Sequence, residues 1–445
     1  MDETLARDWN WSQRFPMQPE VLEYFEYVDS KLDISKDYDF GTTVTQAVFD
    51  ETNAAWNVSL SDGRLLLARW LVLGVGFSSK TRVPNIEGLQ LFEGEIHHTG
   101  AWPESGGDVK GKKVAIVGTG TSAAQTIREI GPSVASLTVY QRDPAIALPL
   151  LPNDSVDPDP SLPQRGEGNG LFAAKALSTF TGINHAFLNP NAVPADSPTR
   201  QAYYNYLYEK GDWSLLYSNF EDMWTNESVS NDVYSVWAKR TRERIEDAAK
   251  CDLLVPETPN HPIGTKRVCL IDNYYETFNR PNVSLVDIVK EPLREITKTG
   301  IRSGEEHHDY DMIIFATGFQ PLASGILAMN ITGRSGMRLE DSWNKSSNSY
   351  LGMTVPGFPN MLYLNGPGSP TVGVNAPTVI EHQTQWMMTL LNFLRKSYIS
   401  TFEATDAAAQ GWRKELIKQW DASLFSSAII MQNNNHASRG KEPTW

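Results

Sequence analysis

Hydrophobic and polar positions follow several different periods along the first part of the chain. Apolar side chains recur every three to four residues from Pro19 to Leu32, which predicts an amphipathic helix behind a proline suited to a first helical turn. Apolar runs broken by turn residues such as Asp62-Gly63 predict the strands of a small β-meander. The predicted strands cover Thr42 to Phe49, Ala55 to Leu60 and Leu65 to Val75.

A second pattern begins further along, where an apolar strand runs directly into a glycine loop. Lys113 to Val117 predicts that strand, Ser122 to Ile130 a helix, and Ser136 to Gln141 the next strand of a βαβ unit. Residues 151–166 predict a surface loop, and residues 167–250 predict a mostly helical, aromatic-rich segment. Further strands are predicted at 283–289, 311–317 and 361–364, and helices at 377–396 and 405–424. This alternation of strands and helices predicts an α/β fold.

Charge and cysteine content narrow the functional classes. The 445-residue chain has 53 acidic and 39 basic residues, a formal net charge of -14, so we expect no nucleic-acid partner. Cys251 and Cys269 are too few and too distant for a disulfide framework or a thiolate metal site, so we expect reduced thiols and no metal. The N-terminal residues do not resemble a secretion signal, and no apolar run is long enough to span a membrane, which predicts a cytoplasmic protein.

The loop Gly118-Thr119-Gly120-Thr121-Ser122-Ala123 has the spacing of a dinucleotide-binding turn. Gly118 would permit the tight turn, and Gly120 would let the backbone approach a pyrophosphate. The N-terminus of the following helix would supply donors and positive potential to the phosphates. We therefore expect these six residues to bind a dinucleotide; the alternative is a plain tight turn.

Arg142 and Asp143 follow the second strand of this unit and are further cofactor-binding candidates. An acidic residue at the strand end would bind the ribose 2'-hydroxyl of NAD, whereas the Arg142 guanidinium suits the 2'-phosphate of NADP. The Asp143 carboxylate would repel that phosphate if it turned inward. The sequence favours NADP, with a solvated charge at a strand end as the alternative interpretation of Arg142.

A third motif lies just before the glycine loop, where Phe92, Gly94, His98 and Trp102 are followed by Pro103. This segment resembles the F-x-G-x-x-x-H-x-x-x-W-P signature of Baeyer-Villiger monooxygenases. In that family the segment is a linker whose histidine and tryptophan couple nucleotide binding to domain motion. Taken without the family, a histidine such as His98 is more often an ordinary hydrogen-bonded structural residue.

The segment Gly264-Thr265-Lys266-Arg267 is similar to the G-T-K-R segment of the same family. The resemblance implies that Lys266 faces the NADP phosphate and that Arg267 stabilises the negative flavin peroxide and the developing oxyanion. Such charge calls for a cation that cannot lose its proton, and an arginine meets that need. Without the family, a dibasic pair of this kind is more often a solvated loop.

The resemblance implies a two-dinucleotide-binding-domain, Rossmann-like flavoprotein with a helical insert, in which the first FAD βαβ unit is missing from this chain. No glycine-rich fingerprint precedes residue 92, and residues 1–18 cannot supply one. We expect a remnant FAD domain at 1–104 and an NADP-binding domain at 105–150 and 251–282. A helical insert and possible substrate lobe would occupy 151–250, and the rest of both domains with C-terminal helices would occupy 283–445.

Flavin contacts left to such a chain would be marginal. The candidates are the backbone near Val44 and the turn from Gly366 to Pro370, which the resemblance places close to the flavin. The family's nicotinamide-contacting tryptophan lies before a G-K pair. Met431 to Asn435 occupy that region here, before Gly440-Lys441, and contain no tryptophan.

Two functions remain open from the sequence. The first is an FAD- and NADPH-dependent Baeyer-Villiger monooxygenase that uses molecular oxygen and inserts one oxygen atom next to a ketone, in secondary metabolism, or that oxidises a soft heteroatom. The second is a flavin-free derivative acting as a non-redox isomerase, a cyclase or a binding protein. A bulky apolar ketone is the expected substrate, since the insert is rich in aromatic residues that core packing explains equally well: Phe172, Phe180, Phe187, Tyr203, Tyr204, Trp213 and Trp224.

Overall fold

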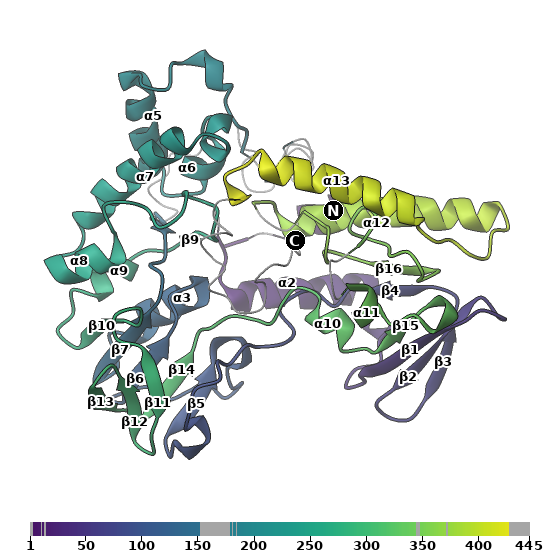
Figure 1. Cartoon of the computed structure of the whole chain (residues 1–445), viewed down its shortest axis with the longest axis horizontal. Coiled ribbons are helices and arrows are strands. Elements are labelled where there is room, and N and C mark those ends of the chain that lie inside the picture. Colours follow the sequence, from purple (N-terminus) through teal and green to yellow (C-terminus); the bar gives the residue numbers. More distant parts are fainter. Residues whose placement is uncertain are drawn as a thin grey trace.

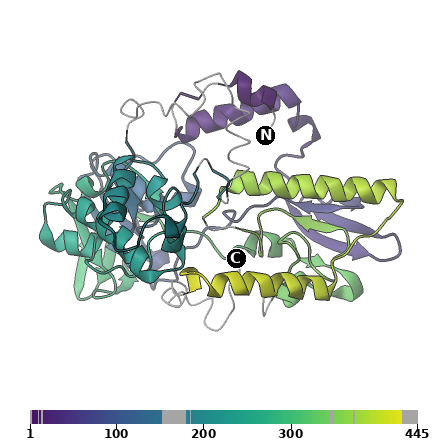
Figure 2. The same ribbon diagram turned by 90° about the horizontal axis from the view of Figure 1, so that it is seen from above.

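The computed structural model describes residues 3–9, 11–12, 15–151, 179, 181–183, 185–343, 348–370 and 373–426. Phe172, Phe180, the segment 431–435 and the pair Gly440-Lys441 lie outside these residues. Figures 1 and 2 show two halves, one around a five-stranded sheet and one holding the remaining large sheet with two long helices.

The five-stranded sheet is parallel throughout and has the order β10-β7-β6-β14-β5. Its central strand β6 (Lys113–Val117) is buried on both faces, which explains its uninterrupted apolar sequence. The helix α3 (Thr121–Ile130) leaves β6 through the glycine loop and packs Ala124 and Ile127 against the sheet. The other strands are β5 (Glu95–His98), β7 (Ser136–Gln141), β10 (Val283–Asp287) and β14 (Met312–Phe315).

Two small sheets flank this one. An antiparallel sheet follows β10 along the chain, and its Ile296 and Ile301 pack with Ala115 and Phe315 of the parallel strands. It consists of β11 (Leu293–Ile296), β12 (Gly300–Ser303) and β13 (Glu306–Asp309). A short parallel pair joins the end of the glycine-loop unit to the strand that follows the G-T-K-R segment. The pair is β8 (Ala147–Leu148) and β9 (Cys269–Leu270).

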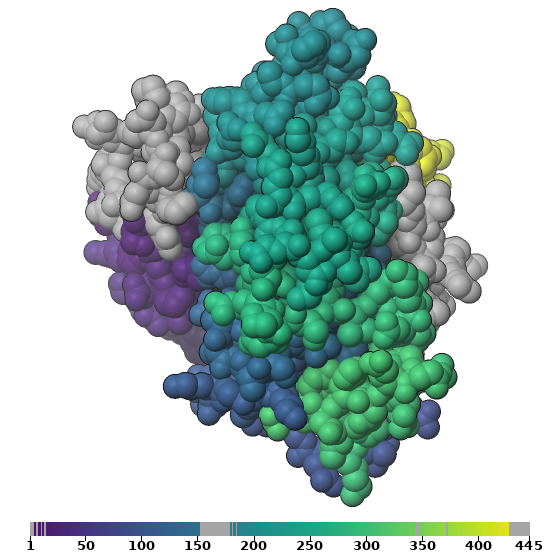
Figure 3. All heavy atoms as spheres, turned by 90° about the vertical axis from the view of Figure 1, so that its left-hand side faces the viewer, coloured from purple at the N-terminus to yellow at the C-terminus, as the bar shows by residue number. Residues whose placement is uncertain are grey.

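A helical segment between β8 and β9 stands on the five-stranded sheet. Figure 3 shows it in teal above the blue and green elements of the sheet. Arg200 is fully buried there, with its guanidinium hydrogen-bonded to both carboxylate oxygens of Asp222 and stacked 3.9 Å over the Phe220 ring. The segment and its continuation contain α5 (Pro198–Glu209), α6 (Ser214–Tyr217), α7 (Glu227–Arg242), α8 (Ala248–Leu254) and, after β9, α9 (Tyr274–Thr277).

The other half has a four-stranded sheet of order β15-β1-β2-β3. Trp56, fully buried in this sheet, donates its indole N–H to the carbonyl of Pro359 at 2.9 Å. The strands are β1 (Val44–Asp50), β2 (Ala55–Leu60), β3 (Leu65–Ala68) and β15 (Ile331–Thr332), with a separate parallel pair β4 (Leu71–Leu73) and β16 (Met361–Tyr363).

Two long helices run along this half (Figure 2), and shorter helices complete the chain. The long ones are α12 (Ala376–Lys396) and α13 (Asp406–Asp421); the shorter ones are α1 (Glu3–Asp8), α2 (Gln18–Leu32), α10 (Ser324–Leu327) and α11 (Leu339–Trp343). Single 3-10 turns lie at Ser35–Asp37, Leu89–Leu91, Thr99–Ala101, Pro190–Ala192, Glu221–Trp224 and Arg334–Gly336.

Two expectations from the sequence need correction. The predicted strand from Leu65 to Val75 is two strands in different sheets, because β3 pairs with β2 whereas β4 pairs with β16. The amphipathic helix α2 forms at the expected place, yet none of its residues is buried, and Phe25 is 63% exposed. Within the described residues no helix has the length and apolarity needed to cross a membrane, and no group of acidic, histidine or cysteine side chains is arranged to hold a metal ion.

Candidate functional site

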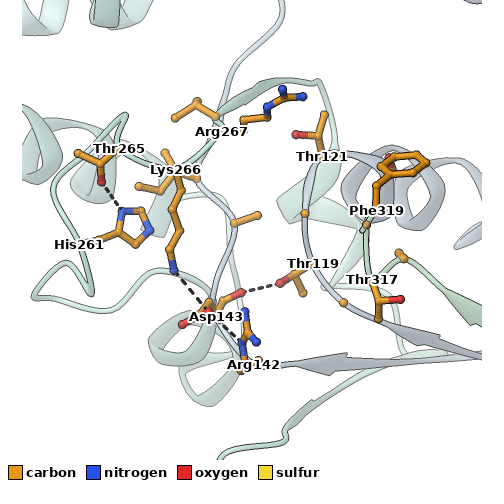
Figure 4. Close-up of a pocket in the computed structure, with 18 of the residues that line it drawn as sticks. Thr119, Thr121, Arg142, Asp143, His261, Thr265, Lys266, Arg267, Thr317 and Phe319 are labelled. Carbon is orange, nitrogen blue, oxygen red and sulfur yellow. Dashed lines mark hydrogen bonds and ion pairs between the residues drawn. The ribbon is translucent and has the colours of Figure 1, made fainter. Parts of the chain in front are cut away.

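A cavity of about 1340 Å³ is lined by both halves of the molecule. Its walls include the glycine loop, residues 142–146 after β7, the G-T-K-R segment, part of the helical segment, residues 365, 370 and 373–376, and the end of α13. Figure 4 shows several of its polar residues, which come from elements far apart in the sequence. The sequence candidates on its wall are Gly118, Thr119, Gly120, Thr121, Ser122, Arg142, Asp143, Lys266 and Arg267.

The glycine loop has the geometry that the sequence predicts. Gly118 has φ +110°, and a Cβ atom there would lie 2.5 Å from the Ala316 carbonyl oxygen, so only glycine fits. Gly120 caps the N-terminus of α3, and a Cβ there would meet nothing within 4 Å. This open space beside unpaired helix N–H groups fits the pyrophosphate of a dinucleotide. Ala123 is fully buried beneath the loop.

Arg142, Asp143 and Lys266 form a cluster of charges at one side of the cavity (Figure 4). The Asp143 Oδ2 atom lies 3.1 Å from Arg142 Nε and 3.4 Å from Lys266 Nζ. Burial alone would raise the pKa of Asp143, but the two cations outweigh burial and hold the pKa below its usual value. Thr119 of the glycine loop donates its hydroxyl to the Asp143 carbonyl oxygen at 2.5 Å, which fixes the cluster beside the loop.

His261 lies beside this cluster in the cavity wall. Its side chain is buried, and Nδ1 lies 3.1 Å from the Pro262 carbonyl and 3.3 Å from the Thr265 hydroxyl. Burial lowers the pKa of His261, and the nearby Lys266 ammonium lowers it further. The imidazole is therefore neutral at pH 7 and adds no positive charge to the cluster.

Arg267 points away from the neighbouring Lys266, toward the other side of the cavity (Figure 4). Its guanidinium lies 5.1 Å from the centroid of the Phe77 ring. No carboxylate in the described part of the chain pairs with it. An exposed guanidinium held on an aromatic face, with donors still available, can stabilise negative charge on a bound molecule.

The fingerprint segment, Phe92 to Pro103, lies outside the cavity but touches its wall. Its strand β5 is the edge strand of the five-stranded sheet and pairs with β14, a pairing that the linker interpretation did not anticipate. Gly94 is required by close packing, since a Cβ there would lie 2.5 Å from the Asp311 carbonyl oxygen. Phe92 packs under the sheet with Ile86 and Leu89.

His98 and Trp102 contact different neighbours. The His98 ring packs against Phe319, which lines the cavity. Burial lowers the pKa of His98, although the backbone of Arg82 and Gly318 acts in the opposite direction. The Trp102 ring packs against His97, with ring centroids 5.2 Å apart.

The turn after β16 supplies a polar group to the cavity. Asn365 is buried with φ +49°, and its Oδ1 atom has no hydrogen-bond donor among the described residues. An acceptor left unpaired in a cavity wall fits a ring N–H donor such as the one that a flavin carries. Val44, the other flavin-contact candidate, is the first residue of β1 and packs against the core of the half with the four-stranded sheet. It is not among the described residues that line the cavity.

Some wall residues were not selected from the sequence. Phe77, Arg82 and His261 carry no motif, and only the fold brings them to the glycine loop. Trp213, an aromatic residue that the sequence analysis did name, faces the cavity together with three that it did not: Tyr217, Trp420 and Phe425. Trp224 packs behind them, stacked between Tyr217 and Phe425 with interplanar angles of 18° and 3°.

Comparison with known proteins identifies the family. An FAD-binding monooxygenase of Epichloe uncinata is 35% identical over 446 residues, which cover 100% of this chain and 82% of the relative. Cyclopentanone 1,2-monooxygenase of Comamonas sp. is 35% identical over 95% of this chain and 77% of its own length. The chain belongs to the FAD-binding Baeyer-Villiger monooxygenase family.

Solved structures agree with this assignment. A steroid monooxygenase bound to NADP superposes with a TM-score of 0.87 at 32% identity, covering 96% of this chain and 80% of that one. Cyclohexanone monooxygenase from Rhodococcus sp. Phi1 bound to NADP+ superposes with a TM-score of 0.89 at 29% identity, covering 100% and 82%. The two-domain α/β flavoprotein fold expected from the sequence is confirmed. Residues 2–146 also match the family model of L-lysine 6-monooxygenase/L-ornithine 5-monooxygenase.

Proposed function

We propose that this chain is an FAD- and NADPH-dependent monooxygenase that inserts one oxygen atom between a carbonyl carbon and its neighbour. The ketone, O2, NADPH and a proton give an ester or lactone, water and NADP+. The observation that carries this proposal is the meeting of three groups in one cavity: a dinucleotide loop, a cation cluster beside it, and Arg267 on the opposite side. The family assignment supports the same chemistry.

NADP is held by two groups in this proposal. The pyrophosphate lies in the open space at Gly120, against the N-terminus of α3. Arg142 and Lys266 receive the 2'-phosphate, because both reach the same point beside the glycine loop. The nicotinamide then extends into the cavity, toward Arg267.

Arg267 acts on the substrate. FAD, when bound, supplies the transfer of electrons from NADPH to oxygen, and Asn365 offers an acceptor for it in the cavity wall. The Arg267 guanidinium keeps its charge at every working pH, so it stabilises the negative charge that develops on the carbonyl oxygen of the ketone. Contact with the Phe77 ring positions the guanidinium. A carboxylate partner would neutralise its charge, but the aromatic ring does not.

A bulky apolar ketone fits the aromatic part of the cavity wall. Trp213, Tyr217, Trp420 and Phe425 present aromatic surface there, next to Ile183 and Leu216. Such a wall excludes water and favours a ring system over a short linear chain. The relatives named as FAD-binding monooxygenases in the fungi Epichloe uncinata and Aspergillus aculeatus support a role in secondary metabolism.

The domain division expected from the sequence remains part of the proposal. We assign residues 1–104 to the FAD-binding part, 105–150 and 251–282 to the NADP-binding part, 151–250 to a substrate lobe, and 283–445 to both nucleotide parts. Strand β5, within the first range, pairs with β14 and so joins the five-stranded sheet of the NADP-binding part. We also infer a cytoplasmic location, because Cys251 and Cys269 are both free and buried, as in proteins of reducing compartments.

An isotope experiment tests the function. The purified full chain is incubated with FAD, NADPH, 18O2 and a set of cyclic ketones, and the products are analysed by mass spectrometry. An ester or lactone carrying one 18O atom is the expected product. NADPH consumption that yields only hydrogen peroxide contradicts the proposal, as does conversion of a ketone without oxygen gain, which would favour a flavin-free isomerase.

An amine panel tests N-oxygenation, the chemistry of the matched family model.

A further inference from the structure

The cations that face the proposed 2'-phosphate site already hold an anion of the protein. One carboxylate oxygen of Asp143, Oδ2, contacts both Arg142 Nε and Lys266 Nζ. The side chain of Asp143 is 36% exposed and that of Lys266 is 24% exposed, so water screens this cluster only in part. The carboxylate therefore occupies the place between the two cations that a phosphate oxygen would take.

Two features anchor the backbone of Asp143 beside the glycine loop. Its carbonyl oxygen accepts the Thr119 hydroxyl from the glycine loop, and the residue is followed by Pro144 in the cavity wall. The carboxylate stays ionised at neutral pH, since the two cations lower its pKa. With the carboxylate in this position, a bound 2'-phosphate would lie within a few ångströms of a negative charge.

We propose that Asp143 determines dinucleotide specificity by competing with the 2'-phosphate of NADP for Arg142 and Lys266, and so weakens the preference of this enzyme for NADP over NAD. This inference rests on the proposed function of the cavity. NAD carries no 2'-phosphate and leaves the three-residue cluster undisturbed. Binding of NADP requires the two cations to exchange a carboxylate for a phosphate while both anions remain close.

The opposite role is physically distinct and testable. If Asp143 chiefly held Arg142 and Lys266 in place for the phosphate, its removal would loosen both cations and weaken NADP binding. If it competes, its removal strengthens NADP binding. Replacement by the nearly isosteric asparagine removes the charge and keeps the size, so the two roles predict changes of opposite sign.

The experiment measures the dissociation constants of NADP+ and NAD+ by calorimetric titration of the full chain. Variants are Asp143→Asn, Asp143→Ser as a second uncharged replacement, and Arg142→Ala. Asp252→Asn is the matched control, because Asp252 pairs with Arg242 outside the cavity. We expect Asp143→Asn to bind NADP+ roughly tenfold more tightly, about 1.4 kcal/mol, and to leave NAD+ binding and the control unchanged.

Each other outcome has a definite meaning. An unchanged or reduced ratio of NADP+ to NAD+ affinity in both Asp143 variants overturns the inference. If Arg142→Ala selectively weakens NADP+ at the same time, only the role of Asp143 is wrong and the nucleotide site stands. If Arg142→Ala weakens both nucleotides equally, or no variant binds NADP+, the 2'-phosphate is not bound at this cluster and both proposals fail.

Discussion

The His98 ring packs edge-on against the Phe319 ring, with centroids 6.2 Å apart and planes at 65°. Phe319 lines the cavity, whereas His98 belongs to the fingerprint strand β5. The His98 Nδ1 atom accepts the Gly100 N–H at 3.0 Å, so the 3-10 turn that follows β5 holds the ring in this orientation. His98 therefore stabilises one wall of the cavity by packing against Phe319.

Replacing His98 with alanine should loosen that wall. Phe319 would lose its edge-on partner, and the NADPH side of the cavity would lose a fixed boundary. We expect kcat/KM for NADPH to fall roughly tenfold. The ratio of oxygenated product to NADPH consumed should stay the same, because Arg267 is unchanged. His308→Ala, on the exposed strand β13, is the control and should match the wild type in steady-state kinetics. An equal kcat/KM for NADPH in His98→Ala and the wild type would show that the contact between His98 and Phe319 does not affect function.

The two glycines of the dinucleotide loop should respond differently to alanine. Gly118→Ala forces a left-handed φ and a contact with the Ala316 carbonyl, at a cost of about 2 kcal/mol or more in the free energy of unfolding. Gly120→Ala meets open space and should fold normally, but its methyl group would occupy the proposed pyrophosphate site. Thermal unfolding and NADP+ titration separate the two effects. A stable Gly120→Ala variant with normal NADP+ affinity would refute the placement of the pyrophosphate.

Arg267→Ala should remove oxygen insertion while leaving NADPH binding intact. The loss of the cation that stabilises the developing oxyanion should lower kcat by roughly 10²–10³-fold. Lys266→Ala is the complementary variant, because its side chain points to Asp143 and should affect the affinity for NADPH instead. Product formation per minute and NADPH affinity are measured for both. Retained ester formation in Arg267→Ala would exclude the assigned role.

Phe425→Ala should discriminate between substrates by size. Phe425 stacks on Trp224 at 5.7 Å and closes the aromatic end of the cavity. We expect kcat/KM for a polycyclic ketone to fall roughly tenfold, since an aromatic contact of about 1 kcal/mol and apolar burial are lost. A small cyclic ketone should be little affected. An equal loss for both ketones would indicate that this wall does not contact the substrate.

The sequence predicts the βαβ unit well because its signals are local. Strand β6, the glycine loop and strand β7 lie within a few residues of their predicted bounds, and the same is true of helices α12 and α13. Apolar runs, a glycine pair and a proline at a helix start act over one or two turns, so they can be recognised without the fold. The motif candidates that line the cavity were found in the same way.

The remaining features depend on contacts between distant segments. The apolar run from Leu65 to Val75 gives no sign that it divides, because the partner of β4 is β16, almost three hundred positions away. The three adjacent leucines of β3, 44–66% exposed, look like core residues in the sequence. Phe425 lies in the cavity wall beside Trp224, where Leu424 donates its backbone N–H to the Trp224 carbonyl and the two rings stack, a contact between segments two hundred positions apart. Sequence periodicity carries no information about such pairings.

The visible absorbance spectrum of the purified full chain tests the central claim most directly. The protein is incubated with FAD, separated from free flavin, and then mixed with NADPH in the absence of oxygen. We expect a retained flavin absorbance band that is bleached by NADPH and returns when oxygen is admitted. A folded but colourless protein, or a bound flavin that NADPH does not reduce, would contradict the assignment of this chain as an FAD- and NADPH-dependent monooxygenase.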